Sequence, residues 1–261
     1  MALTLLAAVA VLIQAQATLT AAHSHNDYNR ARPLAEALER GFGSVEADVC
    51  LVDGELRVAH ETRSSKKGRT LESLYLRPLW DRFQKLGGKV HTDGAPLVLL
   101  IDVKTDAERT YAALKAALEP FQPMLARYDD AKRPGAVEVL LSGNVPRATV
   151  AREPVRLVAI DGRPEDLDSN PPVDLVPWIS VSWLANFRWL GFGEMSAEDA
   201  EKLKNLVQRT HSQGRRLRFW ATPDYPPFWQ KLREAGVDIL GTDNPERLAS
   251  FLRDQPTSGP K

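Results

Sequence analysis

The chain has 261 residues, of which 43% are hydrophobic and 26% charged, and this favours one large domain with a sizeable core. Lysine plus arginine and aspartate plus glutamate number 34 each, so no overall charge attracts nucleic acid or an anionic membrane. Nucleic-acid-binding proteins are therefore disfavoured, and an anionic substrate needs local charges to hold it. Cys50 is the only cysteine, which excludes an internal disulfide.

An apolar segment begins the chain. It runs from Leu3 to Ile13 and precedes Ala15-Gln16-Ala17, a small-x-small pattern that suits signal peptidase, although no Lys or Arg precedes it. We expect a signal peptide over residues 1–17 and a secreted or periplasmic protein. The alternative is a buried first strand or helix of the domain. The run is short for a membrane span, so we expect no stable span and at most transient contact with a membrane surface.

Short apolar runs then alternate with longer helical patterns, which is typical of a parallel α/β fold. The expected strands are Leu19–Ser24, Ser44–Leu51, Leu97–Val103, Val137–Ser142, Val155–Asp161, Trp178–Trp183, Arg216–Thr222 and Val237–Thr242. The expected helices are Pro33–Arg40, Leu71–Lys85, Asp106–Leu125, Val145–Arg152, Ala197–Gln213, Pro226–Ala235 and Pro245–Leu252. Eight strands with interposed helices over about 240 residues predict a single-domain TIM (β/α)₈ barrel. We place this domain at residues 18–254, followed by a disordered tail over 255–261.

The stretch "LVDGELRVAH" predicts a β-hairpin after the second strand, because Asp53-Gly54 is a two-residue turn signal between apolar runs. This hairpin would return His60 to the place where Glu46 and Asp48 leave the barrel.

Carboxylates and a lysine are expected at one mouth of this barrel. Glu46 and Asp48 are two residues apart on a strand, so their side chains share a face, and Asp102 and Lys104 repeat the spacing on the third strand. Barrel enzymes place their chemistry at the carboxyl ends of the strands. Burying three carboxylates there is costly unless they bind something, and a hard divalent cation, Mg²⁺ or Ca²⁺, prefers oxygen ligands. For Asp102 and Lys104 alone, a strand-end salt bridge is the alternative.

Two histidines flank this group. His23 closes the first strand and His60 closes the hairpin, so one could act as general base and the other as general acid. A lone histidine at a strand end is more often a hydrogen-bonded structural residue. Two of them beside a Glu-x-Asp pair favour catalysis.

At these residues the chain resembles the phospholipase C-like phosphodiesterases, including glycerophosphodiester phosphodiesterases and sphingomyelinase D-type phospholipases. The motifs that carry the resemblance are the His23 strand end, "SVEADVCLVDGELRVAHE", "LLIDVKT" and "FWATPD…REAGVDILGTDNPERL". The start "HSHNDY" is most similar to the branch related to the fungal altered inheritance of mitochondria protein 6. The resemblance implies a TIM-barrel phosphodiesterase that cleaves a glycerophosphodiester or a (lyso)phospholipid head group.

Roles for single residues follow from the resemblance alone. It implies that His23 and His60 are the catalytic acid/base pair, and that one divalent cation binds Glu46, Asp48 and Asp102. Its further implications concern the substrate: Lys104 would neutralise the phosphate and Trp220 would line the pocket. His25 and Asn26 are interpreted as groups that orient the substrate. The attacking hydroxyl is water or the substrate's own neighbouring OH, and protein partners are not indicated.

Three further features have alternative interpretations. His23-x-His25 at a first strand end also resembles the metal site of amidohydrolases, but His91 and His211 fall outside strand ends, so later zinc ligands are missing. A secreted barrel that binds a ligand without catalysis is a second alternative. Aromatic residues around the sixth strand, including Trp178, Trp183, Phe187, Trp189 and Phe192, predict either an apolar lip for acyl chains or ordinary packing. Asp243 either hydrogen-bonds the site or caps the last helix.

Overall fold

A computed structural model describes residues 17–254 of the chain. The expected signal peptide, apart from Ala17, and the expected disordered tail lie outside the described residues. Within residues 17–254, no helix combines the length and the apolar character needed to cross a bilayer.

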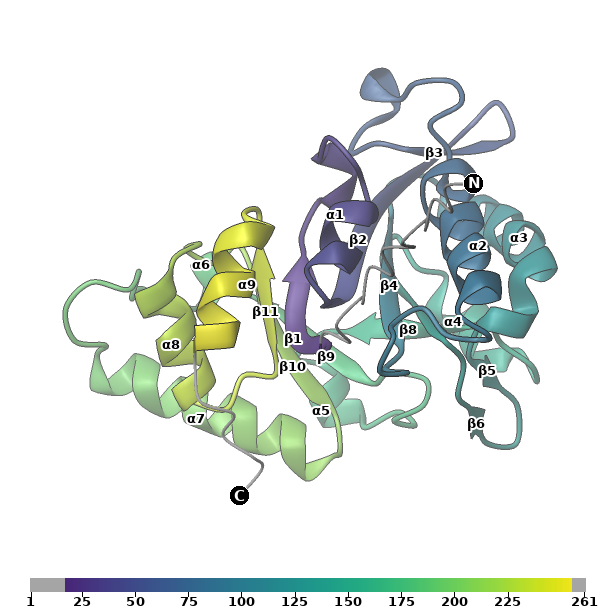
Figure 1. Ribbon diagram of the computed structural model, residues 1–261. Helices are drawn as coiled ribbons and strands as arrows, with labels where there is room; N and C mark the ends of the chain where they lie inside the picture. Colours follow the sequence, from purple (N-terminus) through teal and green to yellow (C-terminus); the bar gives the residue numbers. More distant parts are fainter. Residues whose placement is uncertain (1–16, 255–261) are drawn as a thin grey trace, which may run out of the picture.

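Eight parallel strands close into a ring (Figure 1), which confirms the predicted TIM barrel. The hydrogen-bonded order is β1-β2-β4-β7-β8-β9-β10-β11, and β11 pairs with β1. The bounds are β1 Leu19–Ser24, β2 Phe42–Val52, β4 Leu97–Val103, β7 Val137–Gly143, β8 Val158–Gly162, β9 Trp178–Ser182, β10 Arg216–Trp220 and β11 Ile239–Thr242. Each predicted strand is present, with ends that differ by up to three residues.

Helices surround the ring, and in Figure 1 α2 and α3 lie on one side of it while α7, α8 and α9 lie on the other. Their bounds are α1 Ala35–Glu39, α2 Arg77–Lys85, α3 Ala107–Leu118, α4 Arg147–Arg152, α5 Asp166–Ser169, α6 Trp183–Asn186, α7 Ala197–Ser212, α8 Pro226–Glu234 and α9 Pro245–Asp254. The long ones are amphipathic: α9 buries Leu248, Ala249 and Phe251 against the barrel. The short helices α5 and α6 were not predicted.

Prolines shorten two of the predicted helices. The expected helix Leu71–Lys85 begins as a π-turn over Glu72–Leu76 and becomes α2 only at Arg77, because Pro78 has no amide hydrogen for a normal helical bond. The expected helix Asp106–Leu125 ends at Leu118 and continues as a 3₁₀ turn over Glu119–Met124, which contains Pro120 and Pro123.

The predicted hairpin is also present. β3 (Glu55–Val58) pairs antiparallel with the end of β2, outside the ring, and Asp53 and Gly54 turn the chain with positive φ angles of 52° and 81°. The Ala59 amide then donates to the Asp48 carbonyl at 3.0 Å, which brings the following His60 back to the mouth of the barrel. A second, unpredicted hairpin joins β5 (Arg127–Tyr128) and β6 (Lys132–Arg133).

The barrel interior changes character along its axis. Along β4, Val98 and Leu100 precede Asp102 on the same face, and the first two belong to an apolar cluster inside the ring that also includes Trp178. Beyond this cluster the buried residues are polar or charged, with Glu46 among them. A larger apolar cluster fills the space between ring and helices. Because the helices supply the main core, the carboxyl half of the barrel is left for polar side chains.

Candidate active site

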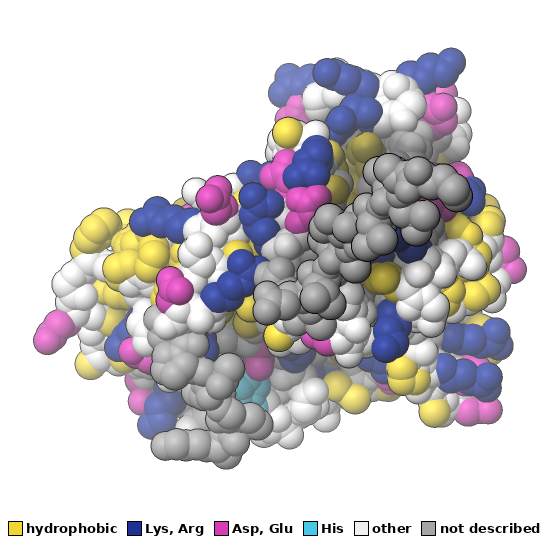
Figure 2. Space-filling view, viewed as in Figure 1, with side chains coloured by type: hydrophobic (Ala, Val, Ile, Leu, Met, Phe, Trp, Pro, Cys, Tyr) yellow, Lys and Arg dark blue, Asp and Glu magenta, His cyan; other side chains and the backbone are white. Residues whose placement is uncertain are grey.

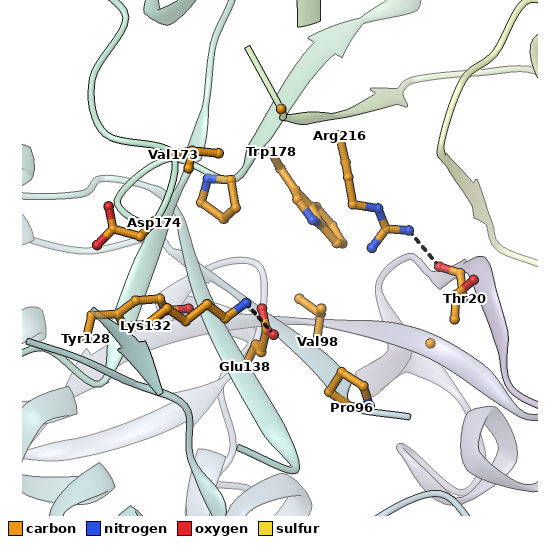
Figure 3. Close-up of a pocket in the computed structure, with 13 residues that line it drawn as sticks. Thr20, Pro96, Val98, Tyr128, Lys132, Glu138, Val173, Asp174, Trp178 and Arg216 are labelled. Atoms are coloured by element: carbon orange, nitrogen blue, oxygen red, sulfur yellow. Dashed lines mark hydrogen bonds and ion pairs between the residues drawn. The ribbon is translucent and has the colours of Figure 1, made fainter. Parts of the chain in front are cut away.

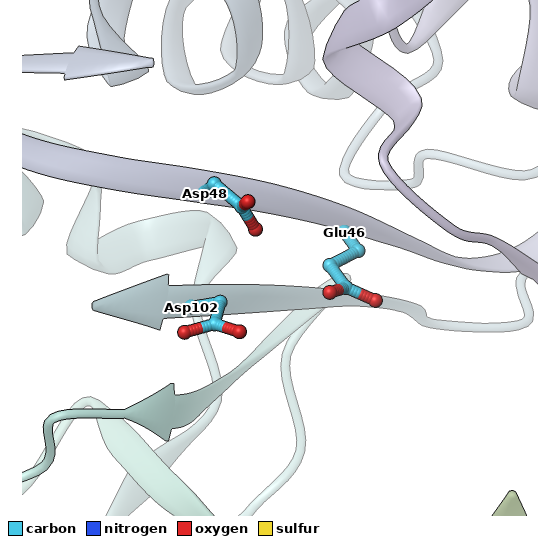
Figure 4. A group of neighbouring side chains, drawn as sticks. All are labelled: Glu46, Asp48 and Asp102. Atoms are coloured by element: carbon cyan, nitrogen blue, oxygen red, sulfur yellow. The ribbon is translucent and has the colours of Figure 1, made fainter. Parts of the chain in front are cut away.

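Three carboxylates meet at the carboxyl end of the barrel (Figure 4). Glu46 and Asp48 share the inner face of β2, and Asp48 pairs in register with Asp102 on β4. One oxygen from each residue lies within 4.8 Å of the others. The structure therefore brings together the three predicted metal ligands, and together they form a possible binding site for a cation.

Two basic side chains partly balance these charges. The Nζ atom of Lys104 lies 3.0 Å from Asp102 Oδ2 and 3.3 Å from Asp48 Oδ2. Arg218 on β10 donates from Nη2 to Glu46 Oε2 at 2.6 Å, and both side chains are buried. Burial opposes ionisation of Glu46, but Arg218 and the hydrogen bond with His23 outweigh it and lower the pKa of this carboxyl.

The two aspartates are less well compensated. Burial raises the pKa of Asp48 and that of Asp102, in spite of the nearby Lys104 ammonium. The Tyr28 hydroxyl donates to Asp48 Oδ2 at 2.8 Å, whereas Asp48 Oδ1 is buried with no hydrogen-bond partner. An orphaned carboxylate oxygen between two other acidic groups fits a cation ligand.

These groups line a cavity of about 430 Å³. The predicted residues that line it are His25, Asn26, Glu46, Asp48, His60, Asp102, Lys104 and Trp220, and the residues not predicted are Ser142, Asp161, Arg163, Arg218 and Ala221. His60 is exposed on one wall. Trp220 ends β10, and Ala221, with φ of 51°, turns the chain immediately after it. One cavity thus collects all but one of the predicted site residues.

His23 is the exception. Its side chain is fully buried beneath the cavity, where Nδ1 lies 2.9 Å from Ser44 Oγ and Nε2 lies 2.9 Å from Glu46 Oε2. Burial and the nearby Arg218 lower the pKa of His23 to about 4. With both ring nitrogens engaged by protein groups, the imidazole holds Glu46 in place and has no free nitrogen for a substrate.

His25 occupies the position that His23 was expected to hold. It lines the cavity, and its Nδ1 lies 3.0 Å from Asp243 Oδ1, which confirms that Asp243 hydrogen-bonds the site. Arg30 also contacts Asp243, at 3.4 Å. Burial alone would lower the pKa of His25, but the Asp243 hydrogen bond and the charge of Glu46 raise it. His25 and Asp243 therefore form a histidine–carboxylate pair of the kind that orients an acid/base imidazole.

Sequence reasoning missed a second buried network. The Asp161 carboxylate, at the end of β8, accepts from Ser180 at 2.5 Å, from Ser142 at 3.1 Å and from Arg163 Nη1 at 2.9 Å. Arg163 Nη2 also donates to Ser142 Oγ at 2.9 Å, so its guanidinium is fixed at the cavity wall. The sequence offered a signal for Asp161, which ends a predicted strand. It also offered one for Arg218, another missed residue, which shares a predicted strand face with Trp220.

Another cavity, of about 400 Å³, lies at the amino ends of the strands (Figure 3). Lys132 pairs with Glu138 at 2.6 Å, and Arg216 donates to the Thr20 carbonyl at 2.9 Å. Trp178 lies buried there beneath the Arg216 guanidinium, so it packs inside the barrel and does not form a lip. Because its polar groups largely satisfy one another, this cavity has no comparable catalytic set.

The histidines required by the amidohydrolase interpretation are elsewhere. His91 is buried in the loop before β4, and His211 lies on α7 and pairs with Asp238 at 2.9 Å. Neither lines the carboxylate cavity. A multi-histidine zinc site is therefore not formed by the described residues.

Comparison with known proteins identifies the class. The AIM6-like phosphodiesterase domain matches residues 12–159. The "Altered inheritance of mitochondria protein 6" of Eremothecium gossypii is 31% identical over 282 residues, which cover 94% of this chain and 72% of that protein. The homologue from Arthroderma benhamiae is 29% identical, covering 85% of this chain and 80% of that protein.

Solved structures share the fold. A glycerophosphodiester phosphodiesterase from Parabacteroides distasonis has a TM-score of 0.55 at 15% identity, covering 91% of this chain and 98% of that one. A phosphodiesterase from Oleispira antarctica, solved with the product sn-glycerol-3-phosphate, has a TM-score of 0.54 at 15% identity. The match covers 89% of this chain and 96% of that one. The barrel and its family match define a phosphoric diester hydrolase. The chain belongs to the AIM6-like phosphodiesterase family.

Proposed function

We propose that this hydrolase cleaves glycerophosphodiesters or (lyso)phospholipid head groups at one divalent cation, Mg²⁺ or Ca²⁺, outside the cytoplasm. The observation that carries the proposal is the meeting of three acidic metal-ligand candidates, three basic groups and two accessible histidines around one cavity. The sn-glycerol-3-phosphate in the Oleispira antarctica structure supports a small phosphodiester as substrate. The apolar run Leu3–Ile13 with Ala15-Gln16-Ala17 supports export.

Glu46, Asp48 and Asp102 would hold the cation. His23 and Arg218 both contact Oε2 of Glu46, so Oε1 is the oxygen left for a ligand, and Asp48 offers its unpartnered Oδ1. Oxygen ligands alone favour a hard ion such as Mg²⁺ or Ca²⁺. When bound, such an ion supplies positive charge beside the phosphoryl oxygens.

Lys104 and Arg163 would bind the phosphate. Lys104 Nζ is held between Asp48 and Asp102. The Arg163 guanidinium is held by Asp161 and by Ser142, which pairs in register with Asp102. Side chains fixed by other hydrogen bonds lose little entropy when they bind a substrate. Both cations would also stabilise charge that develops on the phosphoryl oxygens as the bond breaks.

His25 and His60 would transfer the protons. His25, which Asp243 orients, would donate to the leaving alkoxide, and His60 would take the proton from the attacking hydroxyl. The access of both rings to the cavity supports this pair. The earlier prediction that His23 is the second acid/base residue stays a prediction, and its buried contacts support a positioning role instead. Asn26 and Trp220 would orient the rest of the substrate.

The proposed reaction can be tested by ³¹P NMR. Purified protein is incubated with glycerophosphocholine, lysophosphatidylcholine and sphingomyelin, with and without EDTA. We expect a phosphomonoester or a cyclic phosphate to form only without EDTA, and Asp102→Asn to abolish it. A cyclic product would identify a neighbouring hydroxyl as the nucleophile. If no diester of a broad panel is cleaved, a barrel that only binds its ligand becomes the better description.

The two histidine assignments can be separated by the leaving group. A nitrophenolate leaves without protonation, whereas an alkoxide needs a general acid. We expect His25→Gln to lose about 10²–10⁴ in rate on glycerophosphocholine and far less on bis(p-nitrophenyl) phosphate. His23→Gln should instead slow both substrates equally. If His23→Gln alone shows leaving-group dependence, the acid is His23.

A further inference from the structure

Exposed apolar side chains gather at one part of the barrel mouth. Within residues 17–254, six large hydrophobic side chains are exposed, and four of them lie at or after the carboxyl ends of β9 and β10. These four, Leu184, Leu190, Phe192 and Trp220, are called the apolar rim here. Figure 2 shows hydrophobic side chains gathered over the end of the molecule that carries α6 and α8. Such clustering marks an interaction surface, since isolated exposed side chains are common but groups are not.

The tip of the rim is held firmly. Phe192 is 80% exposed and lies between Gly191 and Gly193, which have positive φ angles of 93° and 61°. Its ring stacks on Tyr225, with 5.6 Å between centroids, and the Tyr225 hydroxyl donates to the Leu190 carbonyl. The loop therefore presents Phe192 outward, with its ring packed on Tyr225.

A buried aromatic layer supports this loop from below. The Trp183 indole, fully buried, donates to the Trp189 carbonyl at 2.7 Å, and Trp189 stacks on Phe228 at 5.3 Å. Asp199 on α7 accepts from the amides of Arg188 and Trp189 at 3.0 and 3.1 Å. Because the aromatic residues below are already packed together, Phe192 is not needed to complete the core.

The rim is continuous with the catalytic cavity. Trp220 lines the cavity and is 44% exposed. Its strand neighbour across the β9–β10 pairing is Ser182, and Leu184 follows two residues later on α6. A substrate that enters over Trp220 would therefore have its apolar part beside the rim.

We propose that the apolar rim inserts into a lipid surface and presents the cavity to phosphodiester head groups there. Charge supports a zwitterionic surface, because the hollow that the rim borders has no excess of basic groups to attract anionic lipid. Its charged lining residues are Arg188, Lys202, Glu194, Glu198 and Asp199, and the whole chain carries no net charge. A group of protruding apolar side chains can enter a deformable acyl layer. The link to turnover rests on the proposed function, whereas the lipid contact does not.

Lipid contact is tested by co-sedimentation with phosphatidylcholine vesicles. The full chain carrying Asp102→Asn is used, so that turnover cannot change the membrane. We expect binding that persists in 0.5 M salt and falls about ten-fold for each of Phe192→Ser and Leu184→Ser, as burial of such side chains predicts. Val155→Ser is the matched control, because Val155 is 42% exposed but lies on another part of the surface. It should bind as strongly as the parent.

Activity distinguishes this inference from the proposed function. Phe192→Ser in the active chain should cleave soluble glycerophosphocholine normally and lose at least ten-fold in rate on lysophosphatidylcholine held in vesicles. The inference is wrong if vesicles do not bind the parent, if binding requires anionic lipid, or if Val155→Ser weakens it equally. A dimer that Phe192→Ser dissociates would also overturn it. Vesicle binding without cleavage of any diester would support lipid contact by the apolar rim and refute the proposed function.

Discussion

The buried charges of Glu46 and Arg218 stabilise each other inside the barrel. Arg218 is 3% exposed, and its guanidinium is the main compensation for Glu46. We expect Arg218→Met to lower the free energy of unfolding by about 3–5 kcal/mol, because it leaves a buried charge unpaired. Urea unfolding at neutral pH measures this loss. The double variant Glu46→Gln, Arg218→Met should recover much of it, and a loss below about 1 kcal/mol in the single variant would contradict the pairing.

Asp243 hydrogen-bonds His25, and we expect it to position that imidazole. Burial and Arg218 lower the pKa of the imidazole, but the carboxylates of Asp243 and Glu46 both raise it, and the net effect is a raised pKa. Asp243→Asn should therefore lower the pKa of His25, so the alkaline limb of the rate profile moves to lower pH if His25 is the acid. We expect kcat to fall about ten-fold with little change in KM. An unchanged pH profile would show that the pair is only structural.

At the scale of an element, the end of β7 is shaped around Asp102. Gly143 has φ of +70°, and a Cβ there would lie 2.1 Å from Asp102 Oδ1 and 2.5 Å from the Val103 carbonyl. Gly143→Ala should displace the carboxylate and abolish cation-dependent activity. Gly214→Ala is the matched control, since Gly214 has φ of +71° and open space around it. Gly214→Ala should lose about 1–2 kcal/mol from backbone strain, and Gly143→Ala should lose more because its Cβ also meets the Val103 carbonyl. Only Gly143→Ala should lose activity.

At the scale of the whole molecule, a buried histidine links stability to pH. Burial lowers the pKa of His91, although Asp93 and a bond to the Phe42 backbone oppose this effect and Arg82 adds to it. In the unfolded chain His91 therefore binds a proton near pH 6.5, whereas in the folded chain it stays neutral at that pH. Stability is therefore lost as pH falls below about 6.5. Unfolding curves at pH 7.5 and 5.5 should show a smaller difference for His91→Asn than for wild type.

If His91→Asn shows the same difference between the two pH values as wild type, the acid sensitivity of the chain arises elsewhere.

The barrel and much of its mouth could be predicted from the order of residues along the chain. Short apolar runs that alternate with helical patterns predict eight strands. The spacing of apolar residues along each run indicates whether it forms a strand or a helix and which of its faces is buried. Strand alternation also places Glu46 and Asp48 on one face, and the Asp53-Gly54 turn returns His60 to it. These are local relations, carried by residues that are close in the chain, so the sequence contains them directly.

Which histidine of the His23-x-His25 motif reaches the cavity depends on contacts that form only when the barrel closes. Both share one side of β1 and its extension, but the depth of each depends on neighbours that are distant in the chain: Glu46 on β2 and Arg218 on β10 enclose His23, whereas Asp243 after β11 holds His25. Closure of the ring sets these contacts. The same closure brings Arg163 and Trp220 into one cavity with the carboxylates, which no spacing along the chain could reveal.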